Sequence, residues 1–331
     1  MYTSIYSDKM PDLLEQLANT PELKRLSNVG MHCGCEYASL PLYAHSKPYS
    51  RLTHSIGVAK IIWHFTKDIT QSAAGMLHDI ATPVFAHTID FMNNDHMAQE
   101  STENNTVSFI ANSKSIMRLL DKNNIHIDNI SDYKKYTIAD NDTPMLSADR
   151  LEYTLGNGYT VYNLSLSRLK EIYEDLTIAE NELGYEELCF RSANKAKAFV
   201  EISLKNSYFF VSNEDRFLME YLAKIMRRAI EIGVITLDDL YLTEKDVIKS
   251  LVKSEELSEE WSKFTNISAV SASNEKLHDR YCVKVSAKKR YIDPLVLTEG
   301  GIKRITEIDA DLKTQIEEFQ NLDFNHWIYA V

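Results

Sequence analysis

Four short segments of the chain contain histidine and aspartate side chains of the kinds that bind metal ions and move protons. In chain order they hold His54, the pair His78-Asp79, His87 and Asp149. Imidazole nitrogens and carboxylate oxygens together suit a divalent transition metal. A buried aspartate is costly unless it is compensated, and a metal is a natural partner for it. We therefore predict that His54, His78, Asp79 and Asp149 bind a divalent metal.

Each of these residues alone has an ordinary structural explanation. A lone His-Asp pair is common, and His54 could be a core histidine bonded to a backbone acceptor. The metal prediction depends on all the segments occurring together and in order. His87 lies beyond a break at Thr82-Pro83, so it can face the metal from another element. Since histidine has an ordinary pKa of about 6.5, His87 suits proton transfer at neutral pH.

Helices must position these residues. Apolar side chains recur at helical spacing through residues 52–69 and again through 72–79. Adjacent helical residues point about 100° apart, so His78 and Asp79 reach one centre only near a helix end. We expect Thr82-Pro83 to supply that end, because proline interrupts a helix.

Helical periodicity also extends over much of the remaining chain. It predicts helices at residues 11–18, 21–26, 105–120, 143–155, 166–183, 189–208 and 213–232, and from Thr243 onward. The triplet Gly156-Asn157-Gly158 is typical of a helix end. Residues 280–297 are rich in Val, Tyr and Ile, which predicts two strands. We expect a mainly α fold with a helical core over residues 1–255 and a small C-terminal α+β lobe over residues 256–331.

Composition and charge narrow the function. The 331 residues include 48 acidic and 36 basic side chains, a net charge of −12. This balance disfavours a long nucleic-acid groove or an anionic membrane surface as partner, but it permits a small phosphorylated substrate. Only 10 glycines and 7 prolines occur, which favours long helices over a β-sandwich or barrel.

The chain reads as a cytoplasmic protein. No stretch approaches the roughly 18 apolar residues of a membrane span. The first residues lack the basic and apolar regions of a signal peptide. Four cysteines are too few for a disulfide scaffold at this length, so reduced thiols are the simplest interpretation.

Two further motifs leave alternatives open. His32-Cys33-Gly34-Cys35 suggests zinc, but a second cysteine pair is missing nearby, and a reduced loop is favoured. The basic run Lys288-Lys289-Arg290 could contact a phosphate or an effector, and equally could be a solvated strand end.

The chain also resembles a known superfamily. The likeness rests on RLTHSIGV, GMLHDIATPVFAH and LSADRLEYTL, and covers roughly residues 20–160. These segments are similar to HD-domain phosphohydrolases, most of all to the branch with the deoxynucleoside triphosphate triphosphohydrolases. Residues 233–240 and 289–294 match that branch more weakly.

This resemblance implies a role for several residues. It assigns the metal to His54, His78, Asp79 and Asp149, and the ion would be Mn, Fe, Ni, Zn, Co or Mg. It implies that His87 transfers a proton beside the phosphate and that Asp90 orients it. It places Arg51, Arg150 and Tyr153 at phosphate-contacting positions and Asn157 at a sugar-contacting position. It also implies an HD-domain helical core, a nucleotide or other small phosphorylated substrate, and a homo-oligomer.

Two departures from the branch keep the substrate open. Thr82 stands where the triphosphohydrolases have a second histidine, and Asn157 replaces a carboxylate. The predicted function is therefore a metal-dependent phosphohydrolase acting on a nucleoside triphosphate, a monophosphate or a phosphodiester. The alternative is a nucleotide-binding regulatory module that retains the HD fold with little turnover.

Overall fold

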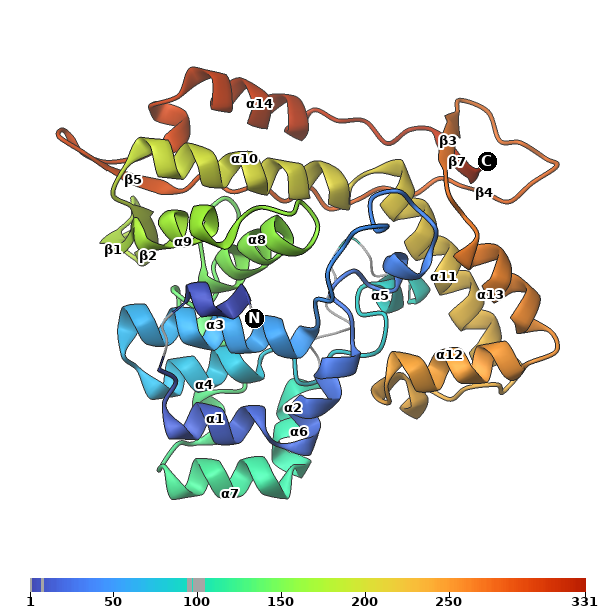
Figure 1. Ribbon diagram of the computed structural model, residues 1–331, viewed down its shortest axis with the longest axis horizontal. Coiled ribbons are helices and arrows are strands. Elements are labelled where there is room, and N and C mark those ends of the chain that lie inside the picture. Colours follow the sequence, from blue (N-terminus) through green and yellow to red (C-terminus); the bar gives the residue numbers. More distant parts are fainter. Residues whose placement is uncertain (1, 7–8, 94–96, 98–104) are drawn as a thin grey trace.

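Helices form most of the computed structural model, which describes residues 2–6, 9–93, 97 and 105–331 (Figure 1). The helices are α1 (Asp12–Ala18), α2 (Pro21–Arg25), α3 (Arg51–Thr66), α4 (Ile69–Leu77), α5 (Thr88–Met92), α6 (Thr106–Asn112), α7 (Lys114–Lys122), α8 (Ala148–Thr160), α9 (Leu166–Glu174), α10 (Ala193–Phe210), α11 (Asn213–Glu231), α12 (Glu244–Lys253), α13 (Leu257–Thr265) and α14 (Ala310–Gln320). The strands are β1 (Leu176–Glu180), β2 (Glu186–Phe190), β3 (Val270–Ser273), β4 (Cys282–Val283), β5 (Leu295–Thr298), β6 (Gly301–Arg304) and β7 (Trp327–Ala330). The fold is thus mainly α with a minor β part, as predicted.

Helix α3 is the central element of the N-terminal half. It packs against α4 on one side and α8 on the other, and α1 and α7 continue the stack below α4 (Figure 1). The predicted helix over residues 52–69 ends early, because Lys67 adopts a left-handed conformation with φ 55°. Asp68 then caps α4 by accepting the backbone N–H groups of Thr70 and Gln71.

The predicted end of α8 is wrong. The helix continues through Gly156-Asn157-Gly158 to Thr160. A Cβ atom at position 156 would lie 2.4 Å from the hydroxyl of Tyr49. The glycine therefore permits a close approach between α8 and its neighbour and does not stop the helix.

Two other predicted helices contain strands. Residues 166–183 divide into α9 and β1, and residues 189–208 begin inside β2 before α10 starts. The two strands pair antiparallel around a turn in which Gly184 has φ 81°. β2 also pairs parallel with β5, with Cys189 opposite Leu295, in a sheet of order β1-β2-β5-β6. This pairing partner lies about 100 residues away, so local periodicity could not reveal it.

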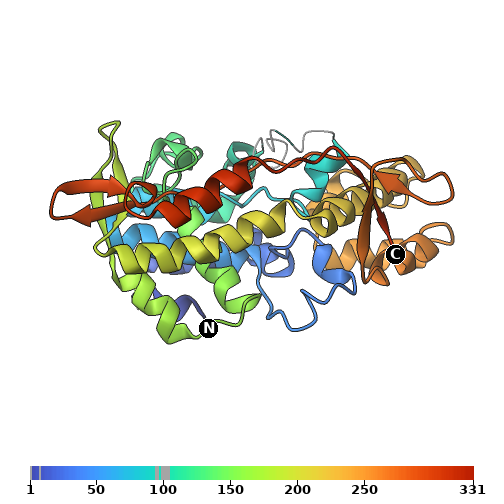
Figure 2. The same cartoon turned by 90° about the horizontal axis from the view of Figure 1, so that it is seen from above.

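The C-terminal residues return along the rest of the molecule. Helix α14 lies beside α10, and the sheet β3-β7-β4 packs against α11 (Figures 1 and 2). The two strands predicted within residues 280–297 are β4 and β5, but they belong to different sheets. The boundary after residue 255 stays a prediction. Within the described ranges, no helix is both long and apolar enough to cross a membrane.

Candidate metal centre

Three helices bring the predicted metal ligands together. His54 lies on the buried face of α3, His78 follows the last residue of α4, and Asp149 lies in the first turn of α8. One ligand atom from each of these three residues lies within 4.8 Å of the others. This is the only such group of histidine, cysteine and acidic side chains in the described part of the chain.

The two histidines present the same nitrogen to the centre. Nε2 of His54 lies 2.9 Å from Oδ1 of Asp149, and Nε2 of His78 lies 3.5 Å from the same oxygen. Each Nδ1 has another partner: Oε2 of Glu152 at 2.5 Å for His54 and the carbonyl oxygen of Gly75 at 2.7 Å for His78. Metal-binding histidines are held in this way, with the outer nitrogen bonded to a carboxylate or carbonyl. The donor set therefore fits a divalent ion.

Asp79 borders the group and is held by its own contacts. Its Oδ2 lies 3.5 Å from Nε2 of His78 and 3.1 Å from the guanidinium of Arg51, while Thr82 donates to Oδ1 at 2.9 Å. Burial alone would raise the pKa of Asp79, but Arg51 and the two histidines hold this pKa well below its ordinary value. Asp79 is thus ionised and lies next to His78.

Charge in the centre favours a cation. Burial alone would lower the pKa of His54, but Asp149 and Glu152 raise it to about 10. Burial would raise the pKa of Asp149, and the contact with His54 nevertheless lowers it. Without a metal, His54 is therefore an imidazolium between two carboxylates, and a divalent ion would take the place of the proton on its Nε2.

His87 and Asp90 form a separate pair. Nδ1 of His87 lies 2.8 Å from Oδ2 of Asp90, which is fully buried, whereas the His87 side chain is 28% exposed. The turn before them contains Phe85 and Ala86 at positive φ, 59° and 38°. Burial lowers the pKa of His87, Asp90 opposes this, and the charge of Arg51 lowers it further. The imidazole is therefore neutral at pH 7, with Nε2 left for proton transfer.

Several residues predicted to contact the substrate make contacts with other residues of the protein. Arg150 donates to the carbonyl oxygen of Met145 at 2.7 Å and to that of Asn141. The Tyr153 ring packs edge-on against Phe210, and burial raises the pKa of its hydroxyl. Oδ1 of Asn157 lies 3.3 Å from Nε2 of His32. Their predicted roles toward a substrate remain predictions.

Glu152 was not among the predicted site residues of this region, and His32 was considered only as part of a possible zinc motif. Glu152, which contacts His54, lies three residues after Asp149 on the same face of α8, and that spacing could have revealed it. His32 is buried, which lowers its pKa to about 4. Its neighbours Cys33 and Cys35 are buried free thiols, and they join no metal-binding group among the described residues.

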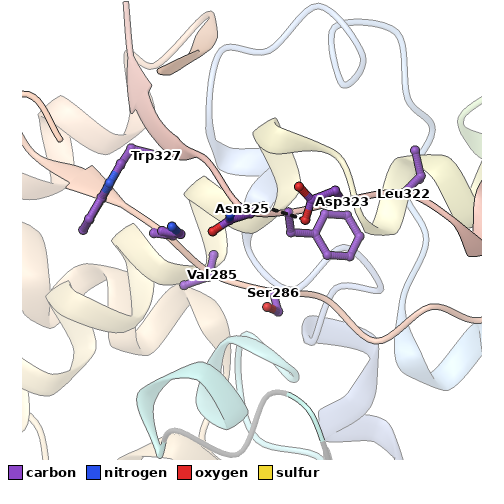
Figure 3. A pocket seen from close by; sticks show the side chains of 8 residues that line it. Val285, Ser286, Leu322, Asp323, Asn325 and Trp327 are labelled. Carbon is purple, nitrogen blue, oxygen red and sulfur yellow. Dashed lines mark hydrogen bonds between the residues drawn. The ribbon is translucent and has the colours of Figure 1, made fainter. Parts of the chain in front are cut away.

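A hollow outside the centre contains none of the predicted site residues. It has a volume of about 510 Å³ and lies between residues 284–286 and 322–327 (Figure 3). Within it, the backbone N–H of Asn325 donates to the carboxylate of Asp323 at 3.1 Å. The candidate site is therefore defined by the histidine and aspartate geometry and not by cavity size.

The chain is similar to proteins of known sequence or structure. It is 26% identical over 293 residues to the uncharacterized protein YdhJ of Bacillus subtilis, covering 87% of this chain and 85% of that protein. A hypothetical protein from Aquifex aeolicus superposes with a TM-score of 0.65 at 17% identity, over 97% of this chain and 93% of that one. A phosphohydrolase from Bacteroides thetaiotaomicron superposes with a TM-score of 0.63 at 16% identity, over 97% and 96%. No family model matches. At these identities the structures share the fold.

Proposed function

We propose that this protein is a metal-dependent phosphohydrolase of the HD-domain type, with a nucleotide or another small phosphorylated molecule as substrate. The observation that carries the proposal is the group of His54, His78 and Asp149, whose ligand atoms lie within 4.8 Å of one another. The fixed Nδ1 atoms of both histidines support it, as does the shared fold with a phosphohydrolase. HD-domain membership itself rests on the motif resemblance.

In this proposal His54, His78, Asp79 and Asp149 hold the ion. When bound, a divalent ion would polarise a phosphoryl oxygen and lower the pKa of a bound water. Asp79 is kept ionised by Arg51, so it stays a competent ligand at neutral pH.

The remaining predicted residues would handle the proton and the substrate. His87 would accept or donate the proton through Nε2, since Asp90 holds its Nδ1 at 2.8 Å. Arg51, Arg150 and Tyr153 would bind the phosphate, which requires Arg150 to release or share its carbonyl contacts. Asn157, held by His32, would face the sugar of a nucleotide.

The second candidate is a nucleotide-binding regulatory module with little turnover. The observation that favours it is Thr82 in place of the second histidine of the triphosphohydrolases, with its hydroxyl bonded to Asp79. Because of the same departure, the proposed substrate is a triphosphate, a monophosphate or a phosphodiester. A homo-oligomer and a cytoplasmic location are further parts of the proposal.

One experiment separates the two candidates. The purified full chain is tested for turnover of nucleotides and chromogenic phosphodiesters with Mn, Fe, Ni, Co, Zn or Mg added, next to His87→Ala and the control His64→Ala. His64 lies on α3 with an exposed side chain, outside the site. Turnover that His87→Ala abolishes and His64→Ala retains supports the enzyme. Saturable nucleotide binding without turnover supports the module.

A further inference from the structure

Glu152 is a fully buried carboxylate held by four side chains. Its Oε2 accepts from the hydroxyl of Tyr49 at 2.6 Å and contacts Nδ1 of His54 at 2.5 Å. Its Oε1 accepts from the hydroxyl of Tyr2 and, at 3.5 Å, from that of Tyr6. We refer to Tyr2, Tyr6 and Tyr49 as the tyrosine cage. The cage satisfies a carboxylate that would otherwise be costly to bury.

Two cage members come from the N-terminal segment, residues 2–6. This segment contains a short 3-10 helix, Tyr2–Ile5, packed against α3 and α9 (Figure 1). The Tyr2 ring packs edge-on against Tyr49 at 5.6 Å and stacks on Tyr159 at 5.8 Å. Tyr6 packs edge-on against Tyr173 at 5.2 Å. Aromatic contacts thus fix the segment where its hydroxyls reach Glu152.

Two glycines inside helices leave room for this arrangement. A Cβ atom on Gly57 of α3 would lie 2.4 Å from Oε1 of Glu152. A Cβ atom on Gly156 of α8 would lie 2.4 Å from the hydroxyl of Tyr49. Glycine destabilises a helix interior. At both positions the helix is therefore less stable, but there is room for the carboxylate and the cage.

We propose that Glu152 and the tyrosine cage are positioning residues of the metal centre, and that residues 2–6 are therefore part of that centre. The cage fixes the carboxylate, the carboxylate fixes the imidazole of His54, and Nε2 of His54 is thereby directed at Asp149. The inference rests on the proposed function in one respect, that an ion binds between these residues. Loss of such an outer contact typically weakens metal affinity about 10- to 100-fold.

Equilibrium titration of the full chain with Co²⁺ alone tests the inference. The d–d absorption of Co²⁺ reports ligand geometry, and thermal unfolding without added metal reports the fold. The test variants are Tyr2→Phe combined with Tyr49→Phe, and Glu152→Gln. The control is Tyr173→Phe, which removes a buried hydroxyl that has no hydrogen-bond partner among the described residues.

We expect both test variants to weaken Co²⁺ binding about tenfold or more and to change the d–d spectrum, with Tyr173→Phe within twofold of wild type. If the folded double variant and Glu152→Gln both bind Co²⁺ with wild-type affinity, the inference is wrong, even if their unfolding temperatures are lower. If the double variant does not fold, Tyr2→Phe alone decides, with wild-type affinity again contradicting the inference. Absence of Co²⁺ binding by the wild-type chain would instead reject the proposed metal site.

Discussion

The hydroxyl of Thr82 donates to Oδ1 of Asp79 at 2.9 Å, on the same carboxylate that Arg51 contacts. The backbone N–H of Thr82 also bonds to the carbonyl oxygen of Asp79 at 2.8 Å. Asp79 is thus fixed from both sides, in the turn that follows α4. Thr82 therefore orients a predicted metal ligand.

We expect Thr82→Val to destabilise the protein and weaken metal binding. A hydrogen bond to a charged group contributes about 1.5–3 kcal/mol, and valine preserves the shape without the donor. Urea unfolding and Co²⁺ titration measure the two effects. Thr82→Ser keeps the hydroxyl and should stay close to wild type; equal behaviour of the valine and serine variants would contradict the prediction.

Metal addition should stabilise the wild-type chain. Ligand at 100 times its Kd contributes about 2.7 kcal/mol to stability. We expect a higher unfolding temperature for the wild type with excess Co²⁺ and reversal on chelation. Asp149→Asn loses a ligand oxygen and should show little of this shift. An equal shift in the variant would place the ion elsewhere.

Activity should persist below pH 6.5. Burial and Arg51 lower the pKa of His87, so the neutral base required for proton transfer survives to a pH below the ordinary value. Asp90→Asn removes the group that opposes this shift, and should lower kcat/KM and move the acid limb to lower pH. The measurement is a pH profile of kcat/KM for both proteins. An acid limb above pH 6.5 in the wild type would be inconsistent with this role.

Two buried carboxyl groups should make folding stability pH-dependent. Glu244 accepts from the backbone N–H of Gly30 and from the hydroxyl of Tyr37, both at 2.8 Å. Burial raises the pKa of Glu244 and of its neighbour Glu36 above the ordinary 4.5. The folded state then holds more protons than the unfolded state above pH 4.5, so their contribution to stability is present below 4.5 and is lost as the pH rises through the raised values.

The variant Glu36→Gln tests this pH dependence. Oε2 of Glu36 is buried and has no hydrogen-bond partner among the described residues, so a neutral amide at this position removes the cost of charging a buried group. We expect a gain on the order of 1 kcal/mol at pH 8 and a flatter profile above pH 4.5. Urea unfolding between pH 4 and 8 measures it. A variant less stable than wild type at pH 8 would refute the assignment.

Arg304 should be important for stability. Its guanidinium contacts Glu187, which is fully buried, at 2.6 Å, and the half-exposed Glu182 at 2.8 Å. Arg304→Met leaves the Glu187 carboxylate uncompensated, which costs about 3–5 kcal/mol. Adding Glu187→Gln should recover part of the loss. Denaturant unfolding checks both proteins, and a loss under about 1 kcal/mol would count against the buried pair.

The sequence was sufficient to predict which candidate metal ligands lie close together. His54, His78 and Asp149 have ligand chemistry in or next to apolar helical segments, and α4 ends at Leu77, directly before His78 and Asp79. Glu152 lies one helical turn from Asp149, but the tyrosines that surround it are distant in the sequence. Its contact with Tyr2 spans 150 residues and that with Tyr49 spans 103.

The errors in secondary structure have the same origin. Residues 176–180 continue the periodicity of α9, yet β1 forms because β2 pairs with it across a short turn. The glycines of α8 resemble a helix stop, yet Gly156 lies inside the helix, where Tyr49 approaches too closely for a larger side chain. In both cases tertiary contacts outweigh the local preference.

The parallel pairing of β2 with β5 has a consequence for biosynthesis. Cys189 and Phe190 cannot pair with Leu295 and Val296 until those residues leave the ribosome, about 100 residues later. Until then the β2 edge carries unpaired backbone groups, a template for association with other chains. Nascent chains that pause between these strands should therefore be the species most in need of chaperones.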